Sequence, residues 1–460
     1  MFLSKELFAE DRGRLLSEGA RLCFLGIGGV SMHALALLCR TRGIEVFGAD
    51  RAESERTQAL RAEGVAVHVP HAGAALDRAS AVVTSLAVGA EDADVLRARA
   101  RGIPIFSRGA LLGALMEEYA LSVAVSGTHG KSTVTAMLAS VLSALGREPT
   151  VLSGAGLSES EGSFRIGGRA LLVAEACEYG DSFLSLRPSV SLFLNLEWDH
   201  PDYFADAEQL MRSFARAAEG SGSVLYNAAS PMLSRMIGRY GIGNCLSVGR
   251  ERDCDYRYEV LAADRGRVTL RFDDGREAPV VLSRSVPGRF QAENAAMVLA
   301  AASYLGIAPS LAAPVLARFS GIGRRLSRIG GDADAPLYYD YAHHPTEIRE
   351  TLAALREMHA TEITVLFRPH TFTRTAALFS DFAAALSLAD RVLVPDIDGA
   401  RESAGAVSAE QLAAAAGGVY LPLSQAADAL RERRGVRVLM GAGDLSSVLC
   451  ALGLDGKKKG

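Results

Sequence analysis

The sequence predicts an α/β protein of three domains, each built around a mainly parallel sheet. Runs of apolar, β-forming residues alternate with helical patterns along the chain, which is typical of parallel α/β layers. The 460 residues exceed what one hydrophobic core accommodates, and three domains are the natural division for that length. Two glycine turns, each between an expected strand and an expected helix, suggest two phosphate-binding sites.

The three blocks follow one another along the sequence. Residues 1–120 contain the strand-like runs RLCFLGIGG, IEVFGAD, VAVHVP, SAVVTSL and IPIFSR. Residues 121–325 begin with LSVAVSG, RALLVAEA and SVSLFLNLEWDH, and continue through the β-rich VTLRFDDGREAPVVLSRSVPG into the helical QAENAAMVLAAASYLG. Residues 326–460 start where Gly, Arg and Pro become frequent, and contain EITVLFRPH, RVLVPDID and VRVLMGAGD.

The composition argues against several classes of protein. A content of 49% apolar and 22% charged residues is typical of a soluble globular chain, and the net charge of -4 argues against a basic nucleic-acid-binding surface. No apolar run approaches a membrane span, and the start MFLSKELFAEDRGRLL is too charged for a secretory signal. The six cysteines lack CxxC spacing, which favours a reducing cytoplasm over disulfides or a cysteine-bound zinc ion.

The first glycine turn follows the run RLCFL and contains Gly26, Gly28 and Gly29, just before Val30. Asp50 ends the next expected strand, at about the distance of a ribose-binding acid in dinucleotide-binding folds. A serine replaces the third glycine of that fingerprint. Two interpretations stay open: a tight turn without a ligand, or a cradle for a diphosphate that belongs to NAD or to a UDP-sugar.

The second turn, AVSGTHGKSTVTAML, is more specific for phosphate. Gly127 and Gly130 allow backbone N–H groups to converge on phosphate oxygens. Lys131 adds a positive charge near the β- and γ-phosphates, and the Ser132 hydroxyl is a suitable Mg²⁺ ligand. Val125 stands where the strict phosphate-loop spacing has its first glycine. An ATP site is favoured over a purely structural turn.

Candidate metal ligands end the neighbouring strands. RALLVAEA delivers Glu175, and SLFLNLEWDH delivers Asp199 and His200. We expect both strands to lie beside the strand that feeds the lysine turn, because open parallel sheets bind ligands at their carboxyl edge. Glu175 suits Mg²⁺, whereas imidazole is a softer ligand. His200 is therefore either a hydrogen-bonded turn residue or the ligand of a second metal ion.

Two polar clusters follow expected strands in the third block. They are Asp340, Tyr341, His343 and His344 in YYDYAHHPTE, and His370 and Arg374 in FRPHTFTR. Each residue could merely cap a helix, but two such clusters at two strand ends favour a site. Arg324 and Arg325, at the crossing between the second and third blocks, either are solvated or reach a γ-phosphate across a cleft.

Together these motifs resemble the Mur ligase family. The family's motifs occur in order from Gly26 to about Asp444, as GIGGVSM, GTHGKST, EACEYGDSF, NLEWDHPDYF, PGRFQAENA, GIGRRL, YDYAHHPTE, FRPHTFTRT and GAGD. The resemblance implies an N-terminal Rossmann-like UDP-binding domain, a central P-loop ATPase domain with a parallel sheet, and a C-terminal Rossmann-like domain. The first turn would then hold the diphosphate of a UDP-sugar, and the second the phosphates of ATP.

The resemblance also implies an activity, which is the ligation of L-alanine to UDP-N-acetylmuramate through an acyl phosphate, driven by ATP with Mg²⁺, in peptidoglycan precursor synthesis. We expect these small molecules as partners, no nucleic acid and no membrane, a cytoplasmic location, and a monomer or weak dimer. Three alternatives remain: a ligase for a preformed peptide, an NAD-dependent oxidoreductase, and a non-catalytic UDP-sugar sensor. GIGGVSM and FRPHTFTRT favour alanine addition, and an oxidoreductase would leave the lysine loop without a task.

The site residues implied by the resemblance fall into four sets. Those expected to contact the nucleotide are Gly127, Thr128, His129, Gly130, Lys131, Ser132, Thr133, Gln291, Asn294, Arg325 and Asp340. Those expected to bind the metal are Ser132, Glu175 and His200. Those expected to contact the UDP-sugar or the amino acid are Gly26, Gly28, Gly29, Val30, Asp50, Ser85, Tyr341, His343, His370 and Arg374. Those expected to act in the reaction are Lys131, Glu175, His200 and Arg325, with His343 or His344 accepting the amine proton.

The chain departs from the family pattern at three of these motifs. Cys177 stands where Asp is frequent, Gln291 where Asn is usual, and Thr371 where many members have Arg. Arg374 would therefore hold the amino-acid carboxylate without a second arginine.

Overall fold

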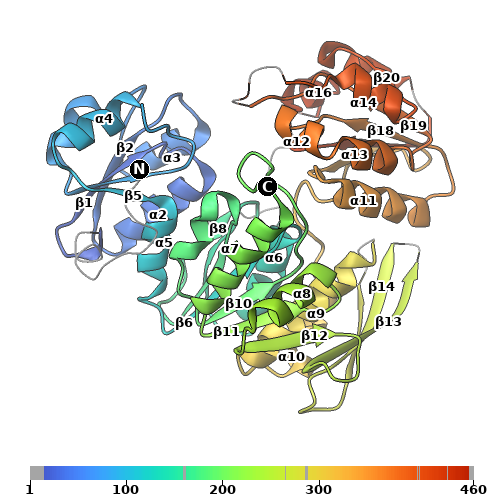
Figure 1. Ribbon diagram of the computed structural model, residues 1–460, viewed down its shortest axis with the longest axis horizontal. Helices are drawn as coiled ribbons and strands as arrows, with labels where there is room; N and C mark the ends of the chain where they lie inside the picture. Colours follow the sequence, from blue (N-terminus) through green and yellow to red (C-terminus); the bar gives the residue numbers. More distant parts are fainter. Residues whose placement is uncertain are drawn as a thin grey trace.

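The computed structural model of the chain describes residues 15–158, 162–264, 266–284, 288–400, 402, 405–432 and 434–454. The first residues and the last residues of the predicted outer domains therefore lie outside the described ranges. The described residues form three sheets of five, ten and six strands, which occupy three successive lobes of the molecule (Figure 1). The predicted three-domain α/β architecture is confirmed; its boundaries at residues 120 and 325 stay predictions.

The N-terminal sheet is fully parallel, with the strand order β3-β2-β1-β4-β5. Its strands are β1 (Arg21–Leu25), β2 (Glu45–Ala49), β3 (Ala66–His68), β4 (Ala81–Thr84) and β5 (Ile105–Ser107). Its helices are α2 (Val30–Thr41), α3 (Glu55–Ala62), α4 (Ala93–Ala100) and α5 (Arg108–Met116). This is the doubly wound order in which ligands bind where the strand order reverses, beside β1.

The central sheet has the order β15-β14-β13-β12-β11-β10-β6-β9-β7-β8. Its strands are β6 (Leu121–Ser126), β7 (Thr150–Leu152), β8 (Phe164–Arg165), β9 (Leu171–Glu175), β10 (Val190–Phe193), β11 (Ser223–Asn227), β12 (Cys245–Gly249), β13 (Tyr256–Asp264), β14 (Arg267–Asp273) and β15 (Val280–Arg284). The strand β6, which feeds the lysine turn, pairs in parallel with β9 and β10. The expected neighbourhood of these three strands is therefore confirmed.

Helices cover both faces of the central sheet. They are α6 (Lys131–Ala144), α7 (Ala207–Glu219), α8 (Pro231–Tyr240), α9 (Phe290–Tyr304) and α10 (Pro309–Ala317), together with the 3₁₀ helix η2 (Tyr179–Ser185). The helices α6 and α9 share an apolar core in which Val134, Met137 and Val298 are fully buried or nearly so. Their packing brings the N-terminal ends of α6 and α9 together. Gly130 directly precedes α6, Asn294 lies near the start of α9, and a Cβ built on Gly130 would lie 2.9 Å from Oδ1 of Asn294.

The C-terminal sheet has the order β16-β17-β21-β18-β19-β20 and is parallel except for β16. Its strands are β16 (Ser327–Gly331), β17 (Pro336–Asp340), β18 (Ile363–Phe367), β19 (Arg391–Val394), β20 (Val419–Tyr420) and β21 (Val436–Met440). Its helices are α11 (Pro345–Met358), α12 (Phe372–Ala377), α13 (Phe379–Leu386), α14 (Ala409–Ala415), α15 (Ala426–Arg431) and α16 (Ser446–Ala451). The strand β21 lies between β17 and β18, so the two predicted polar clusters end strands that are not adjacent in the sheet.

The N-terminal and central lobes share one apolar core, whereas the C-terminal lobe has its own. One cluster of buried side chains contains both Phe24 of β1 and Phe214 of α7. The C-terminal strands pack into separate clusters around Phe367 and Leu439. Contacts between the C-terminal lobe and the phosphate loop are mainly polar, as described below. The packing thus attaches the first lobe firmly to the second.

Two glycines of α5 determine how closely the first lobe approaches the second. A Cβ built on Gly109 would lie 2.5 Å from the carbonyl oxygen of Ser182, and one built on Gly113 would overlap the carbonyl oxygen of Ser185. Both serines belong to η2. The helix α5 therefore lies directly against the backbone of η2, and this approach requires glycine.

We expect Gly113→Ala to lower the free energy of unfolding by about 1–3 kcal/mol, because the added methyl group overlaps backbone rather than a movable side chain. The matched control is Gly238→Ala in α8, where nothing lies within 4 Å of the added Cβ. That control should be neutral or stabilising by up to about 1 kcal/mol, since alanine is the better helix former. Urea unfolding of both variants tests the prediction; equal effects would contradict it.

None of the helices in the described part of the chain combines the length and the apolar composition that a membrane crossing requires.

Candidate active site

The first glycine turn joins β1 to α2 at the carboxyl edge of the N-terminal sheet. Gly26 has φ +77°, in the left-handed region, and the N–H of Gly28 donates to Oδ2 of Asp50 at 2.8 Å. Ser85 lies beside the turn, with its hydroxyl 3.7 Å from the position of a Cβ on Gly26. Val30 begins α2 directly after the turn. The structure thus brings the predicted sugar-nucleotide residues together, and it shows that the Asp50 carboxylate holds the turn in shape.

The second glycine turn joins β6 to α6 and forms a narrow loop. Gly127 and Gly130 have φ values of +147° and +82°. A Cβ on Gly130 would lie 2.9 Å from Oδ1 of Asn294, so a larger residue would fill the loop. Asn195, after β10, fixes the loop from the side: its Oδ1 accepts from the His129 N–H at 2.8 Å, and its Nδ2 donates to the His129 carbonyl at 3.1 Å. These features suit a loop that binds phosphate through its backbone.

Lys131 is folded back onto the loop and onto one buried carboxylate. Its Nζ donates to the carbonyl oxygen of Gly127 at 2.5 Å, and it lies 3.0 and 3.1 Å from the two carboxylate oxygens of Glu178. Burial alone would raise the pKa of Glu178, but the nearby ammonium of Lys131 and the ring of His200 lower it to about 2. Burial likewise opposes the charge on Lys131, yet Glu178 raises the pKa of the lysine above its usual range. Lys131 is therefore a fully charged ammonium at the phosphate loop.

The predicted metal ligands are only partly adjacent. Oγ of Ser132 donates to Oε2 of Glu175 at 2.8 Å, and the same carboxylate oxygen accepts from the Gly154 N–H at 2.8 Å. A hydroxyl and a carboxylate are the oxygen donors that Mg²⁺ prefers, so this pair fits the expected ion. His200 instead lies against Glu178, with Nε2 3.6 Å from its Oε1. Within the described ranges of the chain, His200 makes no hydrogen bond or ion pair with Glu175, so the three predicted ligands do not form one preassembled set.

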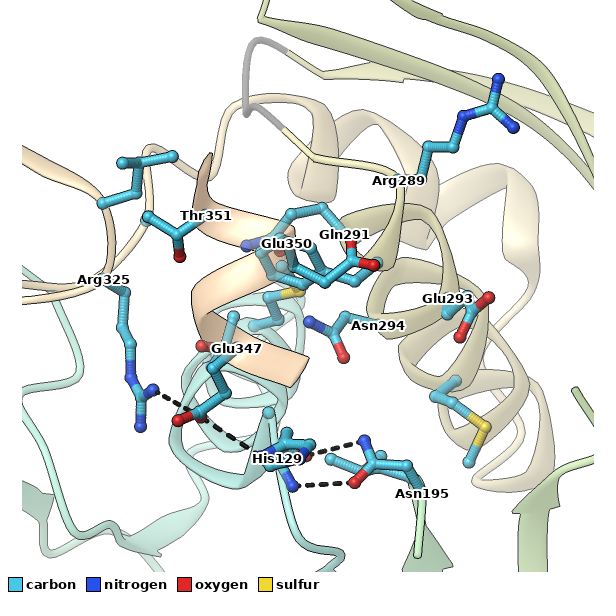
Figure 2. Close-up of a pocket in the computed structure, with 18 of the residues that line it drawn as sticks. His129, Asn195, Arg289, Gln291, Glu293, Asn294, Arg325, Glu347, Glu350 and Thr351 are labelled. Atoms are coloured by element: carbon cyan, nitrogen blue, oxygen red, sulfur yellow. Dashed lines mark hydrogen bonds and ion pairs between the residues drawn. The ribbon is translucent and has the colours of Figure 1, made fainter. Parts of the chain in front are cut away.

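A cavity of about 430 Å³ lies between the phosphate loop, α9 and the start of the C-terminal lobe (Figure 2). Seven of the residues predicted to contact the nucleotide line it: His129, Gly130, Thr133, Gln291, Asn294, Arg325 and Asp340. The side-chain oxygen Oε1 of Gln291 is buried without a hydrogen-bond partner among the described residues. This oxygen is an acceptor suited to an N–H group of a bound ligand, such as the amino group of adenine.

The junction with the C-terminal lobe contributes a cation to this cavity, and the C-terminal lobe contributes an acid. Nη1 of Arg325 donates to Oε1 of Glu347 at 3.2 Å, and its guanidinium lies 5.3 Å from the ring centre of Tyr341. Asp340, at the end of β17, accepts hydrogen bonds from the Thr351 hydroxyl at 2.8 Å and from the Ala342 N–H at 3.0 Å. Burial raises the pKa of Asp340 to about 6, although Arg325 opposes the rise.

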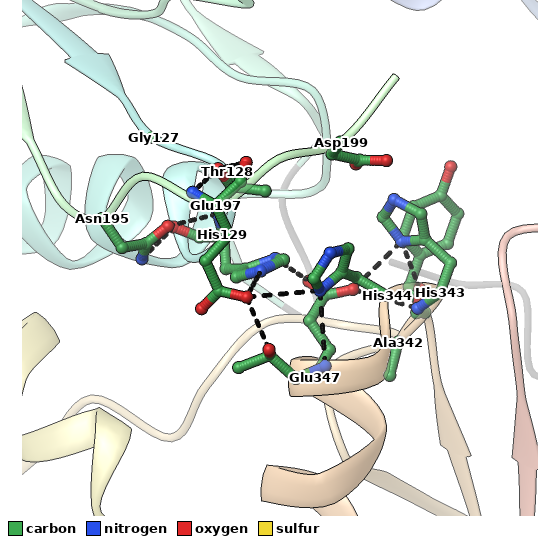
Figure 3. Close-up of polar contacts among 12 residues, drawn as sticks. Gly127, Thr128, His129, Asn195, Glu197, Asp199, Ala342, His343, His344 and Glu347 are labelled. Atoms are coloured by element: carbon green, nitrogen blue, oxygen red, sulfur yellow. Dashed lines mark hydrogen bonds and ion pairs between the residues drawn. The ribbon is translucent and has the colours of Figure 1, made fainter. Parts of the chain in front are cut away.

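The two predicted histidines of YYDYAHHPTE have different surroundings (Figure 3). His343 contacts Glu347 through Nδ1, at 3.1 Å from Oε2. His344 caps α11, and both of its ring nitrogens are engaged: Nδ1 lies 3.5 Å from Oε2 of Glu197, and Nε2 lies 3.4 Å from the Trp198 carbonyl oxygen. Burial lowers the pKa of His344 to about 4.

Arg374 is buried and forms a two-pronged ion pair across the lobes. Its Nε donates to Oδ1 of Asp199 at 2.7 Å, and its Nη2 donates to Oδ2 at 3.3 Å. Nη1 donates to the carbonyl oxygen of His370 at 2.9 Å. Burial opposes ionisation of Asp199, but Arg374 and His200 hold the pKa of this carboxyl well below its usual range. In this arrangement the guanidinium that was predicted to hold the amino acid pairs with a protein carboxylate.

Sequence reasoning named Asp199 but not its pairing with Arg374, and it missed three other acidic partners of the site. Glu178 pairs with Lys131, Glu197 and Glu347 flank His129, and Asp199 pairs with Arg374. All four lie inside motifs already singled out, EACEYGDSF, NLEWDHPDYF and YDYAHHPTE. The available signal was an excess of carboxylates beside histidines and a lysine, which predicts charge pairing. Which carboxylate meets which cation depends on contacts between distant segments.

The fold and the site define a class of enzyme with three α/β domains and a phosphate-binding loop at the edge of the middle sheet. Profiles of the Mur ligase family match three segments. They are described as the Mur ligase family catalytic domain (residues 21–120), the Mur ligase middle domain (residues 125–302) and the Mur ligase glutamate ligase domain (residues 324–447).

Individual relatives agree with these profiles. The UDP-N-acetylmuramate–L-alanine ligase of Caldicellulosiruptor bescii is 35% identical over 385 residues, which cover 82% of this chain and 84% of that protein. The ligase of the same name from Frankia casuarinae is 38% identical over 418 residues, with 83% of each chain covered. The crystal structure of the Thermotoga maritima UDP-N-acetylmuramate–alanine ligase superposes with a TM-score of 0.76 at 27% identity, covering 94% of this chain and 98% of that one. The chain belongs to the Mur ligase family.

Proposed function

We propose that this protein joins L-alanine to UDP-N-acetylmuramate, with ATP and Mg²⁺, in peptidoglycan precursor synthesis. The geometry that supports this function best is the cavity shared by the phosphate loop and the C-terminal lobe. A nucleotide bound in this cavity would lie next to the C-terminal lobe, which is the lobe expected to bind the amino acid. The choice of L-alanine is supported by relatives of that name at 35% and 38% identity. A cytoplasmic location and a monomeric or weakly dimeric state belong to the same proposal.

The first step transfers the γ-phosphoryl group of ATP to the lactyl carboxylate of UDP-N-acetylmuramate, because a free carboxylate is a poor electrophile. The bond to the leaving ADP oxygen breaks as a bond to the carboxylate oxygen forms. Lys131 and Arg325 would neutralise the developing charge. Ser132 and Glu175 would hold Mg²⁺, whose chemistry there is to shield phosphate oxygens and align them.

The second step forms the amide. The amine of L-alanine attacks the acyl phosphate, a C–N bond forms, and inorganic phosphate leaves as the tetrahedral intermediate collapses. The amine must lose one proton, for which His343 and His344 were the candidates. Both ring nitrogens of His344 are engaged, whereas the described contacts of His343 use Nδ1. We therefore assign the proton to His343, which lies beside Glu347.

The experiment that tests this proposal measures phosphate release with ATP, Mg²⁺ and UDP-N-acetylmuramate in the presence of different amines. We expect L-alanine to be used best. Glycine and L-serine should be used about 10- to 200-fold less efficiently, because small size differences discriminate weakly. A preformed peptide that begins with L-alanine should be inactive, since it lacks the α-carboxylate next to its amine.

Two outcomes of this comparison would contradict the proposal. Preference for the peptide would identify a peptide-joining ligase. Absence of phosphate release with every amine, while UDP-N-acetylmuramate still binds, would favour the UDP-sugar sensor.

A further inference from the structure

Two histidines and one glutamate meet at the junction of the central and C-terminal lobes. His129 comes from the phosphate loop, Glu197 follows β10, and His344 precedes α11 (Figure 3). One ligand atom from each residue lies within 4.8 Å of the other two, and the two imidazole rings have centroids 4.7 Å apart. This is the single group of three or more potential metal ligands found in the described ranges of the chain. The proposed ligation chemistry gives this trio no common task.

The separations between the ligand atoms fit a tetrahedral ion. Oε2 of Glu197 lies 3.6 Å from Nε2 of His129 and 3.5 Å from Nδ1 of His344. Zinc bonds to nitrogen and carboxylate oxygen are about 2.0–2.2 Å long, which places neighbouring ligands of a tetrahedron about 3.3–3.6 Å apart. One shared carboxylate oxygen is thus already at ligand distance from both nitrogens. The two nitrogens lie within 4.8 Å of each other, and an ion would draw them closer together.

The surroundings orient both rings as metal ligands are normally oriented. The second nitrogen of His129, Nδ1, lies 3.4 Å from Oε1 of Glu347. The second nitrogen of His344, Nε2, lies 3.4 Å from the Trp198 carbonyl oxygen. A carboxylate or carbonyl oxygen beside the remote ring nitrogen is the usual outer contact of a metal-binding histidine.

The carboxylate is held in place as well. Oε2 of Glu197 accepts a hydrogen bond from the Thr346 hydroxyl at 2.5 Å. The Thr346 N–H lies 3.3 Å from Nδ1 of His344, so an ion would have to replace this long hydrogen bond. The side chains of His129 and His344 are only 13% and 6% exposed, whereas that of Glu197 is 36% exposed. An ion could therefore enter from the side of Glu197.

We propose that His129, Glu197 and His344 form a binding site for Zn²⁺ or a similar late first-row divalent ion, distinct from the Ser132–Glu175 pair. Two imidazoles and one carboxylate are soft enough to select zinc over Mg²⁺, which prefers oxygen ligands. Three protein ligands leave the fourth position open to solvent. Because its ligands come from both lobes, a bound ion ties the phosphate loop to the C-terminal lobe. His129 and Glu197 also line the nucleotide cavity, so the ion faces that cavity.

Titration of the nucleotide-free protein with Co²⁺, followed by displacement with Zn²⁺, tests the site without measuring ligase activity. Four-coordinate Co²⁺ absorbs visible light strongly, whereas six-coordinate Co²⁺ does not. We expect one equivalent of Co²⁺ to give the four-coordinate spectrum, Zn²⁺ to abolish it, and a large excess of Mg²⁺ to leave it unchanged. His129→Ala and His344→Ala should each weaken Co²⁺ binding by at least about tenfold to a hundredfold, since even loss of an outer contact costs about that much.

The matched control is His343→Ala, which removes a neighbouring histidine that contacts Glu347 but not Glu197. Its Co²⁺ affinity should stay within about threefold of the parent protein. Glu197→Gln keeps the size of the third ligand and provides a variant that should fold normally, as melting without metal would verify. Absence of the four-coordinate spectrum in the parent protein would overturn the proposal. So would equal affinities in all variants, or a loss in His343→Ala as large as in His344→Ala. None of these results bears on alanine ligation.

Discussion

Lys131→Ala should lower the turnover number of the ligase by about a thousandfold or more, because it removes the positive charge next to the transferred phosphoryl group. Lys131 is held at the phosphate loop by the Gly127 carbonyl and by Glu178. UDP-N-acetylmuramate should still bind with nearly unchanged affinity, since its expected cradle is the separate turn at Gly26. Phosphate release and calorimetric titration with the sugar nucleotide measure the two effects.

The structure also shows which control this experiment needs. Removal of Lys131 leaves the buried Glu178 without its lysine partner and with only the His200 ring nearby, and an uncompensated buried charge costs about 3–5 kcal/mol of stability. The double variant Lys131→Ala/Glu178→Gln removes that charge and should recover much of the stability. We expect it to remain as inactive as the single variant. Recovery of turnover, or loss of sugar-nucleotide binding in the stable double variant, would contradict the assignment of the two turns.

Arg374→Ala should lower kcat/KM for L-alanine about a hundredfold, if the guanidinium holds the amino-acid carboxylate as predicted. KM for ATP should change little. The structure adds a competing explanation, because Arg374 already forms two hydrogen bonds with Asp199 across the lobes. Loss of the arginine would then impair the protein by leaving a buried carboxylate unpaired.

The double variant Arg374→Ala/Asp199→Ala separates these two explanations. It removes both charges, so its thermal stability should return towards that of the parent protein. If Arg374 binds the substrate, kcat/KM for L-alanine stays low in the double variant. Recovery of kcat/KM together with stability would assign Arg374 a purely structural role and would refute the predicted substrate contact.

Local patterns allowed much of the site to be predicted. The turns at Gly26 and Gly127 need positive φ, which glycine adopts without strain, and each stands between a strand and a helix. Ser132 and Glu175 were predicted to lie together because the strand before Ser132 and the strand that ends at Glu175 were expected to be neighbours. These strands, β6 and β9, do pair, and the two side chains form a hydrogen bond. These features depend on one segment each, or on the regular geometry of a parallel sheet.

Long-range charge pairing could not be predicted in the same way. His200 was expected beside Glu175, yet it lies against Glu178 and within 3.3 Å of Nη2 of Arg374, which is 174 positions away. The clusters at Asp340 and His370 follow strands that are consecutive in the chain, but β21 lies between these strands in the sheet. No local pattern indicates which strand inserts between two others, or which of several carboxylates reaches a cation.

The sequence by itself determined the α/β class, the two glycine turns and the family, because strand and helix periodicity and turn chemistry are properties of short segments. Only the tertiary structure decided that the first lobe packs its core against the second, and that His129, Glu197 and His344 share one junction. The physical reason is that an ion pair or a shared core forms between residues that folding brings together. Its energy depends on burial and distance in space, which the order of residues along the chain does not specify.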